Sequence, residues 1–185
     1  MKLLLLASGT GSLAQAILDA GFEIASVVSD VPGAQVLDRA AAANIATKVI
    51  PFRKPREEWD QELINYVQTV NPDLVVSVGF MRILNSEFVS TFKVINSHPA
   101  LLPNFPGAHA VKDALAAGAT QSGCTVHWVD AGVDTGQVIA QAAVDVLPGD
   151  DEASLHERIK IVERQLIVET IKSLESQSEI GRAHV

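Results

Sequence analysis

The sequence has a single cysteine, Cys124, among its 185 residues, so no disulfide can form within the chain. A lone cysteine is typical of proteins from a reducing compartment. Long apolar runs are missing as well. The first run, Leu3–Ala7, has about five residues, short of the roughly 7–15 of a secretory segment and of the roughly 20 of a membrane span. We therefore expect a cytoplasmic protein in which this run is a buried strand.

Basic residues are fewer than acidic residues. Lys and Arg number 14 against 22 Asp and Glu, which gives a net charge of −8. An acidic chain is poorly suited to broad binding of nucleic acid or of an anionic membrane, although a local cationic pocket could still hold a small anion. The 48% of hydrophobic residues and 19% of charged residues are typical of a globular protein.

Apolar runs of strand length alternate with helical patterns along the chain. The expected strands are Lys2–Ala7, Glu23–Ser29, Ile45–Ile50, Asp73–Val78, Lys93–Ser97, Cys124–Val129 and Val138–Val144. The expected helices are Ser12–Ala20, Gln35–Ala43, Pro55–Val70, Glu87–Phe92, Val111–Ala117 and Glu152–Leu174. This alternation predicts an α/β fold with a single doubly wound, mostly parallel, Rossmann-like sheet flanked by helices. Ligands of such folds bind at the carboxyl ends of the strands.

One domain is expected, over residues 1–178. The last seven residues, 179–185 (EIGRAHV), resemble a translated sequencing adapter. We expect them to be a non-native tail.

A glycine-rich segment, Gly9–Ala14, follows the first strand and opens a helix. It fits the dinucleotide pattern G-x-G-x-x-G/A, and Asp30 ends the second strand 21 residues after Gly9, where the pattern places an acidic residue. The physics is more general, because a glycine loop at a helix N-terminus favours any phosphate. A phosphate monoester, a dinucleotide and a purely structural turn all remain open.

The segment Asn96–Gly107 (NSHPALLPNFPG) begins at the end of an expected strand. Asn96 and His98 are two residues apart, so their side chains should point the same way. An amide beside an imidazole can stabilise an oxyanion and move a proton at a reacting carbonyl. The alternative is that both side chains only satisfy loop backbone groups.

A second loop, Asp130–Gly136 (DAGVDTG), lies between two expected strands. Glycines on either side of Asp134 indicate an unusual backbone that could fix its carboxylate. An ordinary hairpin turn is the alternative, because Asp and Gly are common there. Cys124 and His127 are three apart on a strand, so they face opposite ways, and we expect no metal site.

Together these motifs resemble the formyltransferases that use 10-formyltetrahydrofolate. The resemblance runs from the first strand to about Leu174, and its best match is the branch that formylates the amino group of glycinamide ribonucleotide in de novo purine biosynthesis. It rests on Ser8–Ser12, Gly79–Leu84, Asn96–Gly107, Gly123–Val129 and Asp130–Gly136.

The resemblance implies a role for each matching residue. His98 would be the general acid, Asp134 would support its protonated form and relay protons, and Asn96 would bond the formyl oxygen. The residues implied to bind the ribonucleotide are Gly11, Ser12, Leu13 and Glu163. The residues implied to bind the folate are Arg56, Met81, Arg82, Ile83, Leu84 and Asn96. Attack by the amine would be direct, through a tetrahedral intermediate, without a metal.

The chain departs from the family pattern in three places. Leu13 stands where relatives often have Asn, so phosphate binding must depend on backbone N–H groups and Ser12. Ser97 is often apolar in relatives, and we expect it to face away and to matter little. The C-terminal end is shorter than usual, which bears on stability and assembly more than on chemistry.

Other functions remain open at this stage. A deformylase would pass the formyl group to water, but such relatives carry an extra N-terminal domain, and this chain begins at its first strand. A tRNA formyltransferase would need more positive charge, and a sugar-amine formyltransferase matches less well. A dinucleotide oxidoreductase would use Gly9–Ala14 and Asp30, and an inactive binding protein is also possible. We expect small-molecule substrates and a monomer or homodimer.

Overall fold

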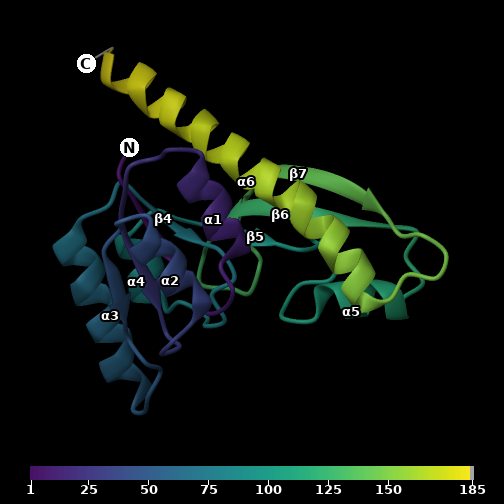
Figure 1. Ribbon diagram of the computed structural model, residues 1–185, viewed down its shortest axis with the longest axis horizontal. Helices are drawn as coiled ribbons and strands as arrows, with labels where there is room; N and C mark the ends of the chain where they lie inside the picture. The colour runs from purple at the N-terminus through teal and green to yellow at the C-terminus, as the bar shows by residue number, and fades with distance from the viewer. Residues whose placement is uncertain (184–185) are drawn as a thin grey trace. The chain divides into compact units, whose positions relative to one another are not determined.

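Seven strands and six helices make up the described part of the chain, residues 1–183 of the computed structural model (Figure 1). The strands are β1 (Leu3–Leu6), β2 (Ile24–Ser29), β3 (Thr47–Val49), β4 (Leu74–Ser77), β5 (Val94–His98), β6 (Gln121–Trp128) and β7 (Val138–Asp145). The helices are α1 (Ser12–Asp19), α2 (Gln35–Ala42), α3 (Arg56–Val70), α4 (Ser86–Thr91), α5 (Ala110–Ala116) and α6 (Glu152–Ala183).

The strands form a sheet in the order β3-β2-β1-β4-β5-β6-β7. Strands β1 to β4 pair in parallel with their neighbours, as does β4 with β5, whereas β6 and β7 are antiparallel. The chain starts near the middle with β1, moves outward through β2 and β3, and returns to place β4 on the other side of β1. The doubly wound, mostly parallel sheet that the sequence predicts is confirmed.

The chain divides into two compact units, Met1–Asn96 and Ser97–Val185. In the first unit every residue of β1 and β4 is buried, which explains their continuous apolar sequences. Leu6 pairs with Ser77, and Ser77 pairs with Asn96. The carboxyl ends of β1, β4 and the first part of β5 therefore lie at one edge of the sheet, where the order of winding switches. This edge is the expected position of a ligand site.

The second unit contains the β6–β7 hairpin, α5 and α6. Its core joins all four elements through Val111, Cys124, Val144, Leu155 and Ile159. Asp151 caps the start of α6, because its carboxylate accepts from the Ser154 N–H at 2.8 Å. The helix therefore begins at a fixed point and lays its apolar stripe against the hairpin.

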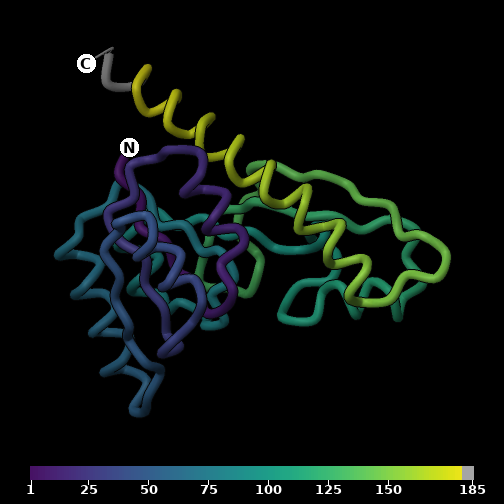
Figure 2. The backbone as a smooth tube through the Cα atoms, in the orientation of Figure 1, coloured from purple at the N-terminus to yellow at the C-terminus, as the bar shows by residue number. Residues whose placement is uncertain are grey.

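Helix α6 extends beyond the predicted end at Leu174 and continues without a break to Ala183 (Figure 2). Residues 175–180 contain no proline or glycine to stop it, and the single Gly181 does not end the helix. The expected non-native tail, 179–185, thus starts inside this helix, and its last two residues lie outside the described ones. Its origin remains a prediction. Within residues 1–183, no helix is long and apolar enough to cross a membrane.

Candidate functional site

The glycine-rich loop leads from β1 into α1, as predicted. Gly11 takes the left-handed conformation, φ 73°, and caps α1, which begins at Ser12. A Cβ at this position would lie 2.5 Å from a methyl carbon of Val36, so only glycine fits. Ser12 and Leu13 occupy the first turn of α1, where backbone N–H groups have no partner within the helix. The loop therefore has the features of a phosphate site.

Asp30, the acidic residue of the dinucleotide pattern, is engaged within the protein. Its side chain accepts hydrogen bonds from the Ser8 hydroxyl and from Arg82 Nε at 2.6 Å, and the residue is only 4% exposed. A dinucleotide site needs this carboxylate for a ribose hydroxyl. Both of its oxygens are already used, which argues against the dinucleotide interpretation.

The residues implied to bind folate come together after β4. The Arg56 guanidinium donates to the Ile83 carbonyl and also pairs with Asp60 at 3.0 Å. The Ser8 hydroxyl accepts from the Met81 N–H. Met81 and Ile83 are 70% and 58% exposed, whereas Leu84 is buried. The segment thus has a fixed backbone and an apolar surface.

Arg82 behaves differently from its neighbours in this segment. The resemblance implies that Arg82 binds the folate. In this structure its guanidinium pairs with Asp30 and lies over the Phe52 ring, 4.2 Å from its centroid. Its charge is therefore satisfied within the protein, and the side chain supports the loop after β1.

Asn96 is half-buried on β5, in register with Ser77 at the sheet edge described above. The same edge receives the glycine loop after β1 and the Met81–Leu84 segment after β4. His98 follows two residues later on the same strand. The alternation of a strand directs both side chains to one face, as the sequence predicts.

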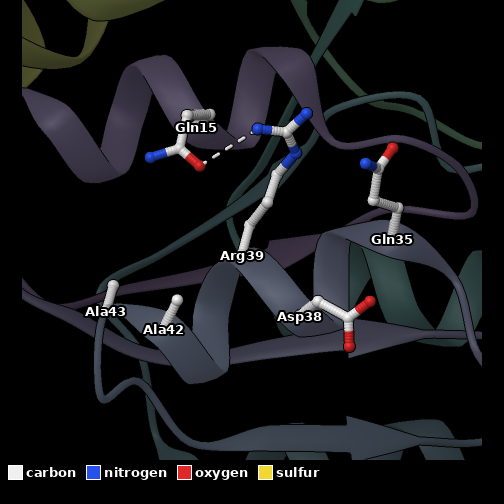
Figure 3. Close-up of a pocket in the computed structure, with 6 residues that line it drawn as sticks. All are labelled: Gln15, Gln35, Asp38, Arg39, Ala42 and Ala43. Atoms are coloured by element: carbon white, nitrogen blue, oxygen red, sulfur yellow. Dashed lines mark hydrogen bonds between the residues drawn. The ribbon is translucent and has the colours of Figure 1, made fainter.

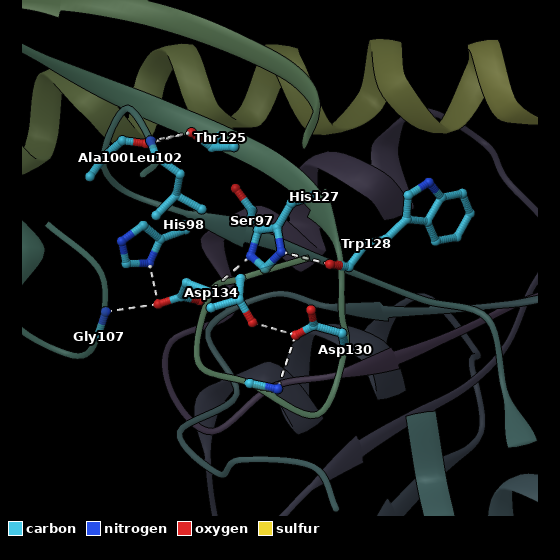
Figure 4. Close-up of polar contacts among 12 residues, drawn as sticks. Ser97, His98, Ala100, Leu102, Gly107, Thr125, His127, Trp128, Asp130 and Asp134 are labelled. Carbon is cyan, nitrogen blue, oxygen red and sulfur yellow. Dashed lines mark hydrogen bonds and ion pairs between the residues drawn. The ribbon is translucent and has the colours of Figure 1, made fainter. Parts of the chain in front are cut away.

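His98 and Asp134 meet in the second unit, although they are 36 positions apart in the sequence (Figure 4). His98 Nδ1 lies 3.4 Å from Asp134 Oδ2, and His98 Nε2 lies 2.8 Å from the Phe105 carbonyl oxygen. A carbonyl can only accept, so Nε2 carries a proton. Nδ1 is the ring nitrogen of His98 that faces Asp134.

Sequence alone leaves His127 open between a residue that lines the pocket and a structural polar contact. Its Nε2 lies 3.5 Å from Asp134 Oδ1, and its Nδ1 donates to the Trp128 carbonyl at 2.8 Å (Figure 4). Asp134 thus lies between two imidazoles. Its pKa is held below the ordinary value of 3.8, mainly by the bond from His127 and further by the Gly107 N–H and His98, although burial acts in the opposite sense. Asp134 is therefore a carboxylate at neutral pH.

The backbone on both sides of this pair is fixed. Asp134 has φ 54°, in the left-handed region, and its Oδ2 accepts from the Gly107 N–H at 2.8 Å. Thr125 Oγ1 donates to the Ala100 carbonyl at 2.6 Å and accepts from the Leu102 N–H at 3.1 Å. The proline-rich loop is thus held onto β6 as well as restrained by its own sequence.

Ser97 corrects one of our expectations. It does alternate away from Asn96 and His98, but its hydroxyl donates to Glu163 Oε1 at 2.6 Å, and both residues are buried. Burial raises the pKa of Glu163, against the opposing effects of Ser97, Lys160 and Arg164. Ser97 therefore matters, because it is the polar partner of a carboxyl group that α6 buries against β5.

Cys124 lies near the same carboxyl group and faces the α6 side of the hairpin. Burial, followed by the charge of Glu163, raises the pKa of its thiol to about 12. The thiol is therefore unreactive at neutral pH. Within the part of the chain that the structure describes, no cluster of three His, Cys, Asp or Glu side chains could hold a metal ion.

Replacing Glu163 with glutamine is expected to make stability less dependent on pH. A raised folded-state pKa adds stability below the ordinary value of 4.5, and this stability is lost as the pH rises through the folded value. Glutamine carries no such proton. In chemical unfolding at about pH 4 and about pH 8, the free energy of unfolding of the variant relative to the wild type should therefore be greater at the higher pH. The same stability difference at both pH values would contradict this expectation.

Comparison with known proteins gives one family. Residues 1–171 match the family model described as formyl transferase. The phosphoribosylglycinamide formyltransferase of Mycobacterium tuberculosis is 48% identical over 187 residues, which cover 94% of this chain and 84% of that protein.

Solved structures agree with the sequence match. The glycinamide ribonucleotide transformylase 1 of Symbiobacterium toebii superposes with a TM-score of 0.90 at 38% identity, over 92% of this chain and 85% of that one. The phosphoribosylglycinamide formyltransferase of Bacillus halodurans gives a TM-score of 0.91 at 32% identity, over 96% and 97%.

Proposed function

The chain belongs to the formyl transferase family and is a formyltransferase, and we propose that it transfers the formyl group of 10-formyltetrahydrofolate to the amino group of glycinamide ribonucleotide, in de novo purine biosynthesis. The observation that carries this proposal is the His98–Asp134 contact at 3.4 Å, two residues after Asn96 on β5. Asn96 offers an amide, His98 an imidazole and Asp134 a carboxylate, and formyl transfer needs one group of each kind.

The reaction proceeds by direct attack. The amino nitrogen of the ribonucleotide adds to the formyl carbon, and the carbonyl π electrons move to oxygen. The Asn96 amide donates a hydrogen bond to this developing oxyanion. Protonated His98 then supplies a proton to the folate N10 as the oxyanion re-forms the carbonyl and the bond from carbon to N10 breaks. The attacking nitrogen gives up a proton to the neutral imidazole that this leaves, which restores protonated His98. No covalent intermediate with the enzyme forms.

Asp134 supports the charged form of His98 throughout. Because Asp134 stays ionised, each proton that His98 gains meets a fixed negative charge. The Nε2 proton, which Phe105 O accepts in the free protein, becomes available when substrate replaces that carbonyl as acceptor. His127 holds the other carboxylate oxygen, so that Asp134 keeps its orientation during proton transfer.

The folate, a co-substrate, suits the surface after β4. Met81 and Ile83 offer exposed apolar side chains to its rings, and the Met81–Leu84 backbone, fixed by Ser8 and Arg56, can hydrogen-bond the polar ring edge. Glu163 is proposed to contact the ribonucleotide on the resemblance alone, because in the free protein its carboxyl group is buried and bonded to Ser97. We also place the protein in the cytoplasm, as its single thiol favours.

The phosphate of the ribonucleotide is proposed to bind Gly11, Ser12 and Leu13 at the start of α1. Leu13→Asn is expected to lower the KM for the ribonucleotide about two- to tenfold, because one added hydrogen bond contributes about 0.5–1.5 kcal/mol. The turnover number kcat should change less, since the phosphate is remote from the reacting atoms. Leu13→Ala is the matched control, and steady-state kinetics with an unchanged KM for Leu13→Asn would contradict this role.

A panel of acceptors tests the proposal. Wild-type protein is incubated with 10-formyltetrahydrofolate and, in turn, glycinamide ribonucleotide, its dephosphorylated riboside, a nucleotide-linked amino sugar, or buffer alone. Mass spectrometry of the products is expected to show a formylated ribonucleotide, with the riboside reacting far more slowly. A preference for the amino sugar, or equal rates with ribonucleotide and riboside, would overturn the substrate assignment.

A further inference from the structure

Helix α2 contacts the glycine-rich loop at two consecutive carbonyl groups. The Val36 N–H donates to the Gly9 carbonyl at 3.2 Å, and Arg39 Nε donates to the Thr10 carbonyl at 2.7 Å. The first bond comes from the backbone of α2 and could be made by almost any residue. The second depends on the arginine side chain, so the identity of residue 39 matters for the loop.

These two bonds fix the direction of the loop's N–H groups. In a trans peptide the C=O and the N–H of one unit point in opposite directions. Because the Gly9 and Thr10 carbonyls point toward α2, the N–H groups of Thr10 and Gly11 point away from it. Consecutive N–H groups turned to one side form an anion-binding concavity. The Gly11 N–H belongs to the set proposed to hold the phosphate.

Arg39 also ties the loop to α1. Its Nη1 donates to Gln15 Oε1 at 3.3 Å, and Figure 3 shows the two side chains meeting between their helices. Gln15 N in turn donates to the Gly11 carbonyl at 2.8 Å, in the first turn of α1. One half-buried guanidinium thus links α2, the loop and α1.

We infer that Arg39 is a positioning residue for substrate phosphate: its guanidinium sets the Thr10–Gly11 peptide so that the Gly11 N–H faces the phosphate group. This inference rests on the proposed function. Leu13 lacks the amide that relatives often carry, so the loop depends on its backbone N–H groups, and their orientation carries more of the affinity. The guanidinium also places a positive charge beside the loop, in a chain of net charge −8.

Arg39→Met tests this inference, because methionine keeps an unbranched chain but cannot donate a hydrogen bond. We expect the KM for glycinamide ribonucleotide to rise at least about tenfold, the loss of roughly one charge-assisted hydrogen bond. The kcat and the KM for 10-formyltetrahydrofolate should stay within about twofold, since a uniform binding contact affects KM alone. Asp38→Asn, an exposed change on the same helix, is the matched control.

Arg39→Lys separates orientation from charge. Lysine keeps the charge, but one ammonium group does not reproduce the fork that reaches both Thr10 and Gln15. We expect a KM between those of wild type and Arg39→Met. A KM equal to that of the wild type would overturn the positioning role in favour of charge alone, and it would do so even if Arg39→Met failed to fold.

Binding of ribose 5-phosphate, measured by calorimetry, keeps this inference separate from the proposed function. Wild-type protein that binds this ester while Arg39→Met binds at least tenfold more weakly supports the inference whatever the acceptor amine. Equal affinity in both proteins overturns it and leaves the formyl transfer standing. Wild-type protein that binds no phosphate ester contradicts the phosphate site itself, and with it the substrate proposed above.

Discussion

Replacing His98 with alanine is expected to lower the kcat of formyl transfer about 100- to 10,000-fold, the usual contribution of a general acid. In the proposed mechanism the imidazole is the proton donor, and the Asp134 carboxylate faces its Nδ1 at 3.4 Å. Alanine removes the proton donor and leaves the Phe105 carbonyl without its partner. Steady-state kinetic assays with both substrates at saturation measure this effect.

The fold should survive this substitution. His98 lies at the end of β5, and the loop that follows it is held at Leu102, whose backbone N–H donates to Thr125 and whose carbonyl accepts from Gln141. Thermal unfolding and circular dichroism are the controls, together with His156→Gln, which changes a histidine on α6. A kcat of His98→Ala within a few-fold of wild type would remove this residue from the chemistry.

Asp134→Asn is expected to lower kcat by a similar factor, because the amide has no charge to stabilise the imidazolium. The effects of His98→Ala and Asp134→Asn should not add, since the carboxylate acts through the imidazole. The double variant should thus be about as slow as the slower single variant. Rates that multiply in the double variant would show that the two residues act independently.

Stability gives a second measurement on Asp134. Its folded-state pKa lies below the ordinary 3.8, so its ionised form stabilises the fold above that value, and this stability is lost as the pH falls through the folded value. The wild type should therefore exceed Asp134→Asn in free energy of unfolding at neutral pH, and the difference should shrink below about pH 4. A difference that grows on acidification would contradict the lowered pKa.

Much of the fold followed from the sequence, because strands buried on both faces are continuous apolar runs. Leu3–Leu6 and Leu74–Ser77 are examples, and each was predicted within two residues of its observed ends. The glycine loop was also predictable, since only glycine tolerates φ 73° against Val36. The strand that carries Asn96 and His98 was also predicted, and strand alternation predicts that their side chains share a face.

The partners of the polar residues did not follow from local sequence. Asp30 matched a dinucleotide pattern, yet its partner Arg82 lies 52 positions away. Ser97 and Glu163 are 66 positions apart. No spacing rule connects such residues, because the tertiary fold alone brings them together. One signal was present: Glu163 lies between Ile159 and Ile167 at helical spacing, so a carboxyl group in an apolar stripe implied a buried partner.

His127 shows the same limit. Its distance from Cys124 correctly excluded a shared face, but only the structure places it on Asp134, which follows a turn. The arrangement of His98, Asp134 and His127 depends on the left-handed backbone at Asp134. The glycines around that residue indicated an unusual turn without revealing where the carboxylate would point.

We expect this protein to pass a formyl group from the folate to glycinamide ribonucleotide and not to water. The absorbance change of 10-formyltetrahydrofolate on addition of the protein, with and without the ribonucleotide, distinguishes the two acceptors. Deformylation of the folate is expected only when the ribonucleotide is present, with one formylated ribonucleotide formed per folate consumed. Folate turnover at the same rate without the ribonucleotide would contradict this expectation.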